Sequence, residues 1–286
     1  MFGKSIVKEK DKMLSNPINC SEVKTHIREI KENGYTILKN YIRKDKVNNL
    51  NKKADNIFKK IDQKQMLPVG LQGIIKNDCM INNAPAYDFD FLDLSTSGDH
   101  LNVIKYFLND KYYNLIPETD PNFILAQSNL RAGKIGLPFH VDVRMVTKGY
   151  QTWSVQCFLA LDNINYKNGC LKIIPKSHLL DYMPDSNKKY KNYVDIDLNQ
   201  GDMVIFSSQA HHSTYECEVS HKPPWTLLLT YRSWWCKQQF DFTKILEKSD
   251  IEKLNDNQKL LIGLCSVVPN DILASPSARH GYELFS

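Results

Sequence analysis

The sequence of 286 residues lacks the marks of several protein classes. Its seven cysteines are widely spread and include no Cys-x-x-Cys pair, which argues against a disulfide framework or a cysteine zinc site and for reduced thiols. The segment from Met1 to Asn16 is charged and has no long apolar run, so it predicts no secretory signal. No later apolar run approaches the length of a membrane span. We therefore expect a soluble, cytoplasmic protein without a membrane partner.

Strong positive charge is also missing. The net charge is only +5, and the chain has no arginine-rich stripe or nucleic-acid motif, so we expect a solvated lysine-rich surface and no nucleic-acid partner. The hydrophobic fraction of 42% is typical of a globular core. Because internal repeats and low-complexity tracts are absent, we expect a single domain over residues 1–286, of undetermined oligomeric state.

The pattern of predicted secondary structure changes near residue 123. Before it, a loose N-terminus (1–20) precedes a helical or irregular flank (21–122), and after it come a β-rich core (123–240) and a C-terminal segment (241–286). Many short strands separated by turns are typical of a sandwich or barrel. The predicted strands are 35–38, 123–130, 152–161, 170–175, 202–206 and 225–234, and the predicted helices are 21–33, 45–61, 100–109 and 251–264. Residues 62–98 are predicted to be irregular.

His140-Val141-Asp142 carries the chemistry that the sequence suggests most strongly. On a strand, residues i and i+2 point to the same face, so His140 and Asp142 can bind one ion. His212 would complete the set from a strand that returns beside the first. Two imidazoles and one carboxylate form the facial triad of non-haem Fe(II) enzymes, which leaves positions open for a co-substrate and O₂.

The neighbouring histidine leaves one ambiguity. His211 and His212 are adjacent, so only one of them can face the metal on an extended chain. Counting from Asp202, His212 lies at an even offset, but a bulge around Ser207-Ser208 would reverse the alternation. The residues alone leave both histidines possible.

A longer set of sequence motifs resembles a known protein family. It comprises Phe139-His140-Val141-Asp142, Leu159-Ala160-Leu161-Asp162-Asn163, Asn168-Gly169-Cys170-Leu171 with Ile174-Pro175-Lys176-Ser177-His178, and Gly201-Asp202-Met203-Val204-Ile205-Phe206 followed by His212. In this order and spacing, from about Gln127 to Arg232, the chain resembles the phytanoyl-CoA dioxygenase family. These are Fe(II)- and 2-oxoglutarate-dependent oxygenases. The resemblance implies a mainly β fold with flanking helices around a double-stranded β-helix, the jelly-roll or cupin-like core.

The resemblance also implies roles for individual residues. The family's distal histidine falls ten residues after the Gly-Asp aspartate, which selects His212. A hydroxyl residue two positions later usually contacts 2-oxoglutarate, and this is Thr214, or Ser213 if His211 were the ligand. The implied cofactors are Fe(II) and 2-oxoglutarate, and the implied reaction is hydroxylation of a small molecule by O₂. No catalytic residue is expected beyond the metal centre.

One position departs from the family. Members usually carry an arginine about twelve residues after the distal histidine, which pairs with the far carboxylate of 2-oxoglutarate. Pro224 stands at that position here. We predict Lys222 as the substitute cation, with Arg131 and Arg232 as alternatives, and Gln127 as a strand-lining amide that also holds the keto acid.

Two other functions follow from the same residues. The missing arginine favours a non-catalytic or 2-oxoglutarate-independent metal-binding jelly-roll protein as the main alternative. A zinc hydrolase is the weaker one, because no separate general base is evident near the triad. Trp153 is a candidate for the pocket wall, although core packing explains it as well.

Overall fold

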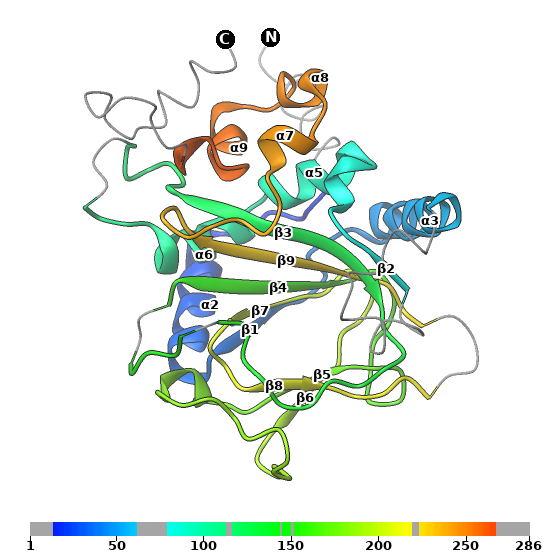
Figure 1. The fold of residues 1–286 in the computed structure, drawn as a ribbon, viewed down its shortest axis with the longest axis vertical. Coiled ribbons are helices and arrows are strands. Elements are labelled where there is room, and N and C mark those ends of the chain that lie inside the picture. Colours follow the sequence, from blue (N-terminus) through cyan, green and yellow to red (C-terminus); the bar gives the residue numbers. More distant parts are fainter. Residues whose placement is uncertain are drawn as a thin grey trace.

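The computed structural model describes residues 14–61, 79–112, 116–143, 145–149, 152–218 and 223–266. Two antiparallel sheets face each other, and helices cover the outer face of the larger one (Figure 1). The larger sheet has the strand order β1-β7-β4-β9-β3-β2, and the smaller has the order β6-β5-β8. Within the described residues the sheets form an open sandwich and not a closed barrel, so the predicted jelly-roll core is confirmed.

The strands of the larger sheet are β1 (Tyr35–Leu38), β2 (Cys79–Ile81), β3 (Phe123–Ala132), β4 (Ser154–Ala160), β7 (Met203–Ser207) and β9 (Thr226–Ser233). Those of the smaller sheet are β5 (Leu171–Ile173), β6 (Val194–Ile196) and β8 (His212–Thr214). The α-helices are α2 (Cys20–Asn33), α3 (Lys44–Lys60), α5 (Phe89–Thr96), α6 (His100–Leu108), α7 (Phe242–Ile245), α8 (Lys248–Ile251) and α9 (Asp256–Leu261). Single 3-10 turns are η2 (Ala84–Ala86), η3 (Ser177–Leu179) and η4 (Leu264–Ser266).

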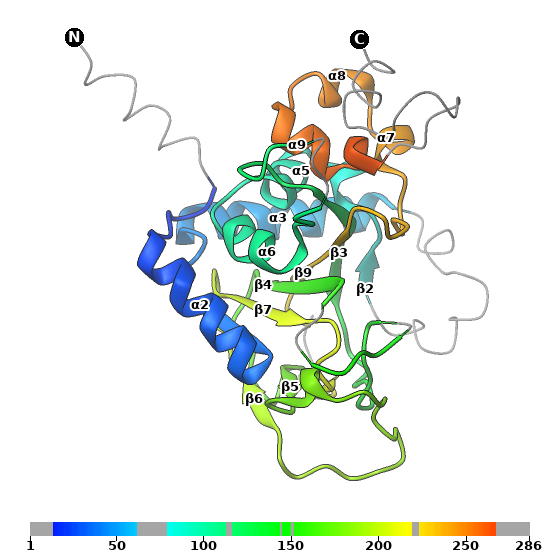
Figure 2. The same cartoon turned by 90° about the vertical axis from the view of Figure 1, so that its left-hand side faces the viewer.

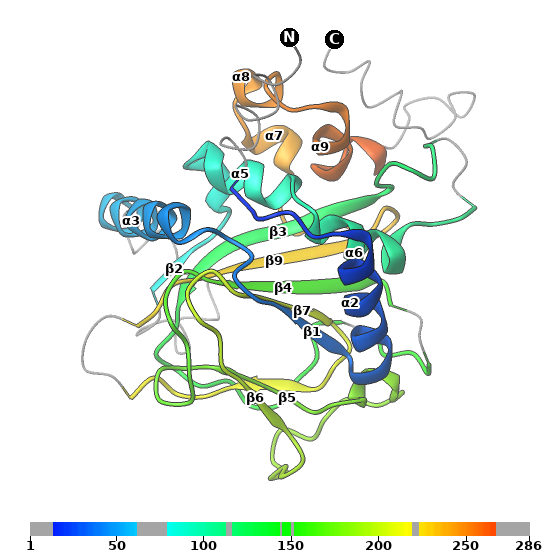
Figure 3. The ribbon, with the colours of Figure 1, turned by 180° about the vertical axis from the view of Figure 1, so that it is seen from behind.

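The helices lie on one side of the larger sheet. Figures 1 and 3 show α5, α6, α7 and α9 over the face that points away from the smaller sheet. Figure 2 shows α2 running alongside, where it packs against β1 and α6. None of the helices in the described part of the chain has the length and apolar character that a membrane crossing needs.

The alternation along β9 explains how one strand serves two environments. Leu227, Leu229 and Tyr231 are fully buried in the core beneath the helices. Thr230 and Arg232 point to the opposite face, which lines the space between the two sheets. Successive side chains of a strand point to opposite faces, so a single apolar–polar alternation gives β9 a core face and a cavity face.

A second apolar cluster fills the other part of the space between the sheets. It combines Val204 and Phe206 of β7 with Leu171 and Ile173 of β5. The two sheets are therefore held together by packing on the β7 side, and the β3, β9 and β4 side stays open.

Several predicted elements need correction. Residues 79–81 and 89–96, predicted as irregular, form β2 and α5, and Phe91 of α5 is fully buried. The single helix predicted at 251–264 is wrong, because Asn255 starts a new helix with a capping box to Gln258. The predicted start at Ser21 shifts as well, since Asn19 caps α2 with Glu22 as its capping-box partner.

Candidate metal centre

Backbone pairing brings the three proposed ligands together. His140 N donates to the His212 carbonyl at 2.8 Å, and His212 N donates back to the His140 carbonyl at 3.0 Å. Asp142 N donates to the carbonyl of Ser208 at 2.8 Å. His140 thus pairs antiparallel with His212 of β8, as expected if His212 lies on a strand that returns beside His140.

The donor atoms converge on one point. One ligand atom from each of His140, Asp142 and His212 lies within 4.8 Å of the others. The two Asp142 oxygens are 3.6 Å from His140 Nε2 and 3.3 Å from His212 Nε2. Atoms at these separations can share a single metal ion, and among the described residues they form a set of two nitrogens and one oxygen.

Hydrogen bonds fix the orientation of both imidazole rings. Nδ1 of His140 lies 2.8 Å from the Pro138 carbonyl, and Nδ1 of His212 lies 2.9 Å from the Ala210 carbonyl. A carbonyl can only accept, so each Nδ1 carries a proton, and Nε2, the nitrogen nearer Asp142, is the atom of each ring that can bind a metal. Metal-binding histidines usually have such an outer partner, which sets the tautomer.

The structure distinguishes the two adjacent histidines. His211 points away from Asp142, and its Nε2 lies 3.0 Å from the carbonyl of Tyr182. His212 is 2% exposed and faces Asp142. Ser213, the hydroxyl residue that would accompany His211, is buried, and Thr214 lines the cavity instead.

The three side chains influence one another electrostatically. Burial lowers the pKa of His140, and repulsion from His212 lowers it further. Burial opposes ionisation of Asp142, but the attraction and hydrogen bond of His212 outweigh it and hold the pKa of Asp142 below its usual value. Burial likewise opposes protonation of His212, but Asp142 raises the pKa of His212 above its usual value. Asp142 and His212 thus favour an ion pair whose proton a metal cation would displace.

The triad opens into a large cavity between the sheets. The cavity has a volume of about 950 Å³, and its floor is the inner face of β3, β9 and β4. In the centre of the floor, Gln127, Thr230 and Gln156 stand side by side in the strand register. Thr230 donates its hydroxyl to Gln156 Oε1 at 2.7 Å. Gln127 therefore lies in the cavity as predicted from its strand, as part of a polar row.

Two arginines line opposite ends of this floor. Arg131 of β3 is paired in register with Thr226 of β9, and Arg232 lies six residues after Thr226 on β9. At about 3.3 Å per residue, the backbones of the two arginines are therefore about 20 Å apart. The predicted cation Lys222 lies outside the described residues and stays a prediction.

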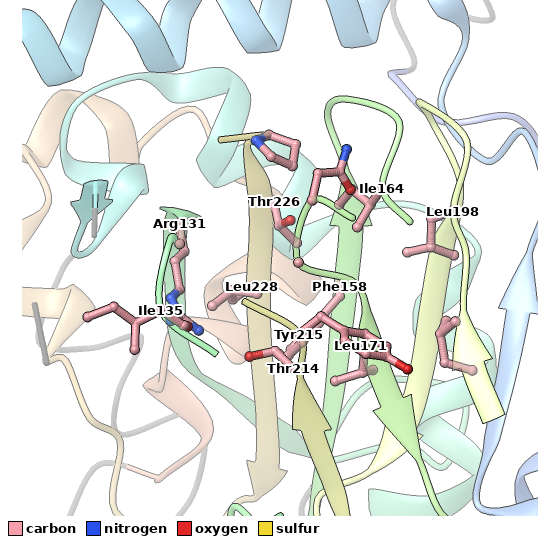
Figure 4. A pocket seen from close by; sticks show the side chains of 15 residues that line it. Arg131, Ile135, Phe158, Ile164, Leu171, Leu198, Thr214, Tyr215, Thr226 and Leu228 are labelled. Atoms are coloured by element: carbon pink, nitrogen blue, oxygen red, sulfur yellow. The ribbon is translucent and has the colours of Figure 1, made fainter. Parts of the chain in front are cut away.

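Arg131 and Pro224, the residue at the position where the expected arginine is missing, line one small cavity. A smaller cavity of about 60 Å³ adjoins the larger one and is lined by Arg131, Thr214 and Pro224. Figure 4 shows the Arg131 side chain extending toward Ile135, with Thr214 and Leu228 across from it. Its Nη2 donates to the Ile135 carbonyl at 3.3 Å, so part of the guanidinium is held by backbone.

The opposite end of the cavity has residues that the sequence did not single out. Trp235, Cys236, Lys237 and two glutamines follow β9 and line the outer part of the cavity. Trp153 also lines it, and its ring centre lies 5.6 Å from that of Trp235. The sequence could have indicated these residues only by their position just after the long predicted strand. The direction in which this turn folds depends on contacts between segments distant in sequence.

Comparison with solved structures shows the fold. The epimerase SnoN from nogalamycin biosynthesis, described as non-heme and alpha-ketoglutarate-dependent, has a TM-score of 0.58 at 15% identity, covering 76% of this chain and 85% of that chain. HygX from Streptomyces hygroscopicus, solved with nickel and 2-oxoglutarate bound, has a TM-score of 0.56 at 11% identity over 75% and 88% of the two chains. The carbocyclase SnoK from nogalamycin biosynthesis has a TM-score of 0.56 at 12% identity over 84% and 94%.

A search of curated proteins finds no match. A family model does match, over residues 30–217, which is 188 of the 286 residues and includes β1, both sheets up to β8 and all three converging side chains. On this match the chain belongs to the phytanoyl-CoA dioxygenase (PhyH) family.

Proposed function

We propose that this protein is an Fe(II)- and 2-oxoglutarate-dependent oxygenase that hydroxylates a small molecule. The observation that carries the proposal is the convergence of His140, Asp142 and His212 at the wall of a cavity of about 950 Å³. Two neutral imidazoles and one carboxylate suit Fe(II), and both rings are already oriented with Nε2 toward the common point. Bound iron would supply the oxidation, in which 2-oxoglutarate, O₂ and substrate yield succinate, CO₂ and the hydroxylated product.

We further propose that the co-substrate lies on the Thr214 side of the triad. Thr214 follows His212 by two residues on β8 and so shares its face. Its hydroxyl oxygen accepts a hydrogen bond from Leu137 N at 2.9 Å, which leaves the hydroxyl proton to donate to a ligand.

Arg131 is our candidate for the cation that holds the far carboxylate. It lines the same small cavity as Thr214 and Pro224, so a β3 side chain brings positive charge to the place where the family's arginine is missing. A guanidinium can pair with a carboxylate through two parallel N–H bonds. Gln127 lies four residues before Arg131 on the same strand and is proposed to contact the middle of the keto acid or the substrate. Lys222 remains a second candidate.

The alternatives lose support from the cavity. A non-catalytic metal-binding module would not need a cation beside the proline that replaces the arginine, and Arg131 is there. A zinc hydrolase would need a general base, and Asp142 is the sole carboxylate among the described residues that line the large cavity.

Anaerobic titration with Fe(II) and then 2-oxoglutarate tests the proposal. We expect a weak visible charge-transfer band that saturates at one equivalent of each, because chelation of iron by the keto acid produces it. If iron binds and no band develops, the 2-oxoglutarate assignment is wrong. Succinate release in the presence of O₂ gives a second readout.

A further inference from the structure

The outer part of the cavity has a composition distinct from the metal side. We define the outer subsite as Arg232, Lys237, Trp153, Trp235 and Met145, all of which line the large cavity. On β9 it begins at Arg232, two residues beyond Thr230 of the polar row, at the end away from Arg131. It is therefore separate from the place proposed for 2-oxoglutarate.

Positive charge dominates this subsite. Arg232 and Lys237 both line it, and Arg232 Nη1 donates to the Lys237 carbonyl at 3.0 Å, which ties the two residues together. Asp142 is the sole carboxylate in the described lining of the whole cavity, and it belongs to the metal centre. The outer subsite itself contains two basic side chains and no carboxylate, so it attracts an anion.

Aromatic surface lies beside these charges. The Trp153 and Trp235 rings meet at 5.6 Å and an angle of 46°. Trp235 is 55% exposed and Met145 is 58% exposed, although both line a cavity. Large apolar side chains left open in a concave site mark a place where a ligand covers them.

The neighbouring tryptophan shows that this exposure is particular to one residue. Trp234 packs against the buried pair Ile116 and Ile124, and its Nε1 donates to Asp110 Oδ2 at 3.1 Å. Two consecutive tryptophans in one turn thus point to opposite sides, one into the structure and the other into the cavity.

The turn that carries Trp235 and Lys237 is braced. Gln238 Nε2 donates to the carbonyls of Leu125 at 2.7 Å and Ile262 at 3.1 Å. Gln239 N donates to the Ala126 carbonyl at 3.0 Å. The subsite is therefore held in place before a ligand arrives, which reduces the entropy lost on binding.

We propose that the outer subsite binds a substrate that combines an oxyanion, either a carboxylate or a phosphate, with a flat apolar ring. The oxyanion pairs with Arg232 and Lys237, and the ring lies against Trp235 and Met145. This inference rests on the proposed function, because it takes the molecule in the cavity to be the substrate of the iron centre.

Three probes test the subsite: naphthalene-2-carboxylate, 2-naphthyl phosphate and the neutral naphthalene-2-methanol. Their binding is measured anaerobically by calorimetry on full-length protein with Fe(II) and saturating 2-oxoglutarate. We expect at least one anion to bind roughly tenfold or more tightly than the alcohol, since a bidentate charged pair forms only with the anion. The tighter of the two anions identifies the substrate as a carboxylic acid or a phosphate ester.

Variants separate charge from ring contact. Arg232→Gln should reduce the preference for the anion to less than about twofold, and Arg232→Lys should retain most of it. Trp235→Leu should weaken all three probes about fivefold, while the matched Trp234→Leu should leave them unchanged in a protein whose melting temperature shows that it is folded.

The proposal is overturned if the wild-type protein binds the alcohol as tightly as both anions, or if Arg232→Gln leaves the preference for the anion intact. The visible band recorded in the same samples tests the function independently. Absence of the band with iron bound rejects the 2-oxoglutarate assignment, while the probe preferences still decide the character of the subsite.

Discussion

The two arginines at the ends of the cavity floor occupy opposite settings. Arg131 packs over Gly133, donates to the Ile135 carbonyl and faces a space of about 60 Å³. Arg232 faces the cavity of about 950 Å³ beside an exposed tryptophan. Both project from the same sheet face into the large cavity, which the triad also lines.

This difference fits the two tasks proposed for the arginines. A small space with an arginine and a hydroxyl group selects one compact anion, as a co-substrate site must. A wide space with a braced aromatic turn accommodates a larger molecule, and its specificity depends on a few polar contacts. The surroundings of each arginine therefore support the role proposed for it, which its distance along the chain from the metal ligands does not indicate.

The largest effect is expected from removing the triad that both ends share. His212→Gln should abolish tight Fe(II) binding, a loss of at least about a hundredfold, because one of three ligands is missing. The matched His211→Gln should keep iron affinity within about threefold, since His211 bonds to the Tyr182 carbonyl. Anaerobic calorimetry with Fe(II) measures both. Normal iron binding in His212→Gln would contradict the ligand assignment.

An intermediate effect should separate the two arginines. Arg131→Gln should weaken 2-oxoglutarate by about 2–3 kcal/mol, roughly 30- to 150-fold, because a charged hydrogen-bonded pair is lost. Arg232→Gln should change this affinity less than about threefold. Titration of the visible band with 2-oxoglutarate measures the affinity.

Pyruvate provides the control for this comparison. It lacks the far carboxylate, so Arg131→Gln and wild-type protein should bind it equally. If Arg232→Gln were instead the variant that loses 2-oxoglutarate affinity, Arg232 and not Arg131 would be the residue that holds the far carboxylate.

The smallest effect comes from displacing Arg131 without removing its charge. A Cβ at Gly133 would lie 2.8 to 2.9 Å from the guanidinium of Arg131, and Gly133 has no positive φ, so alanine strains only that contact. Gly133→Ala should weaken 2-oxoglutarate about threefold to tenfold, because the guanidinium must shift. In an Arg131→Gln background the same change should have no further effect, and an additive loss would reject the explanation.

Much of the fold could be predicted because it depends on local periodicity. The long, mostly apolar run of β9 and the helical spacing in α3 are readable from the chain, and both elements lie close to their predicted positions. The helix at residues 89–96 was missed because α5 is short and is stabilised by burial of Phe91 and Leu92. That burial depends on contacts with segments distant in the sequence.

The candidate site, like the fold, could be predicted only in part. The pair His140 and Asp142 could be identified from its spacing, since strand geometry places residues i and i+2 on one face. Strand alternation left His211 and His212 both possible, and His212 was selected only through the family resemblance, because the orientation of each ring depends on which carbonyl it reaches. Arg131 could not be singled out as the substitute cation, since it is strand pairing that brings it beside Thr214 and Pro224.

By itself, the sequence determined the residue types of the metal centre, the short strands separated by turns and the absence of the family's arginine at Pro224. The tertiary structure alone decided that Arg131 and Arg232 stand at opposite ends of one floor and that Trp235 opens into the cavity while Trp234 does not. The physical reason is that residue type and period are local properties, whereas register, turn direction and the cavity arise from contacts between segments far apart in the chain.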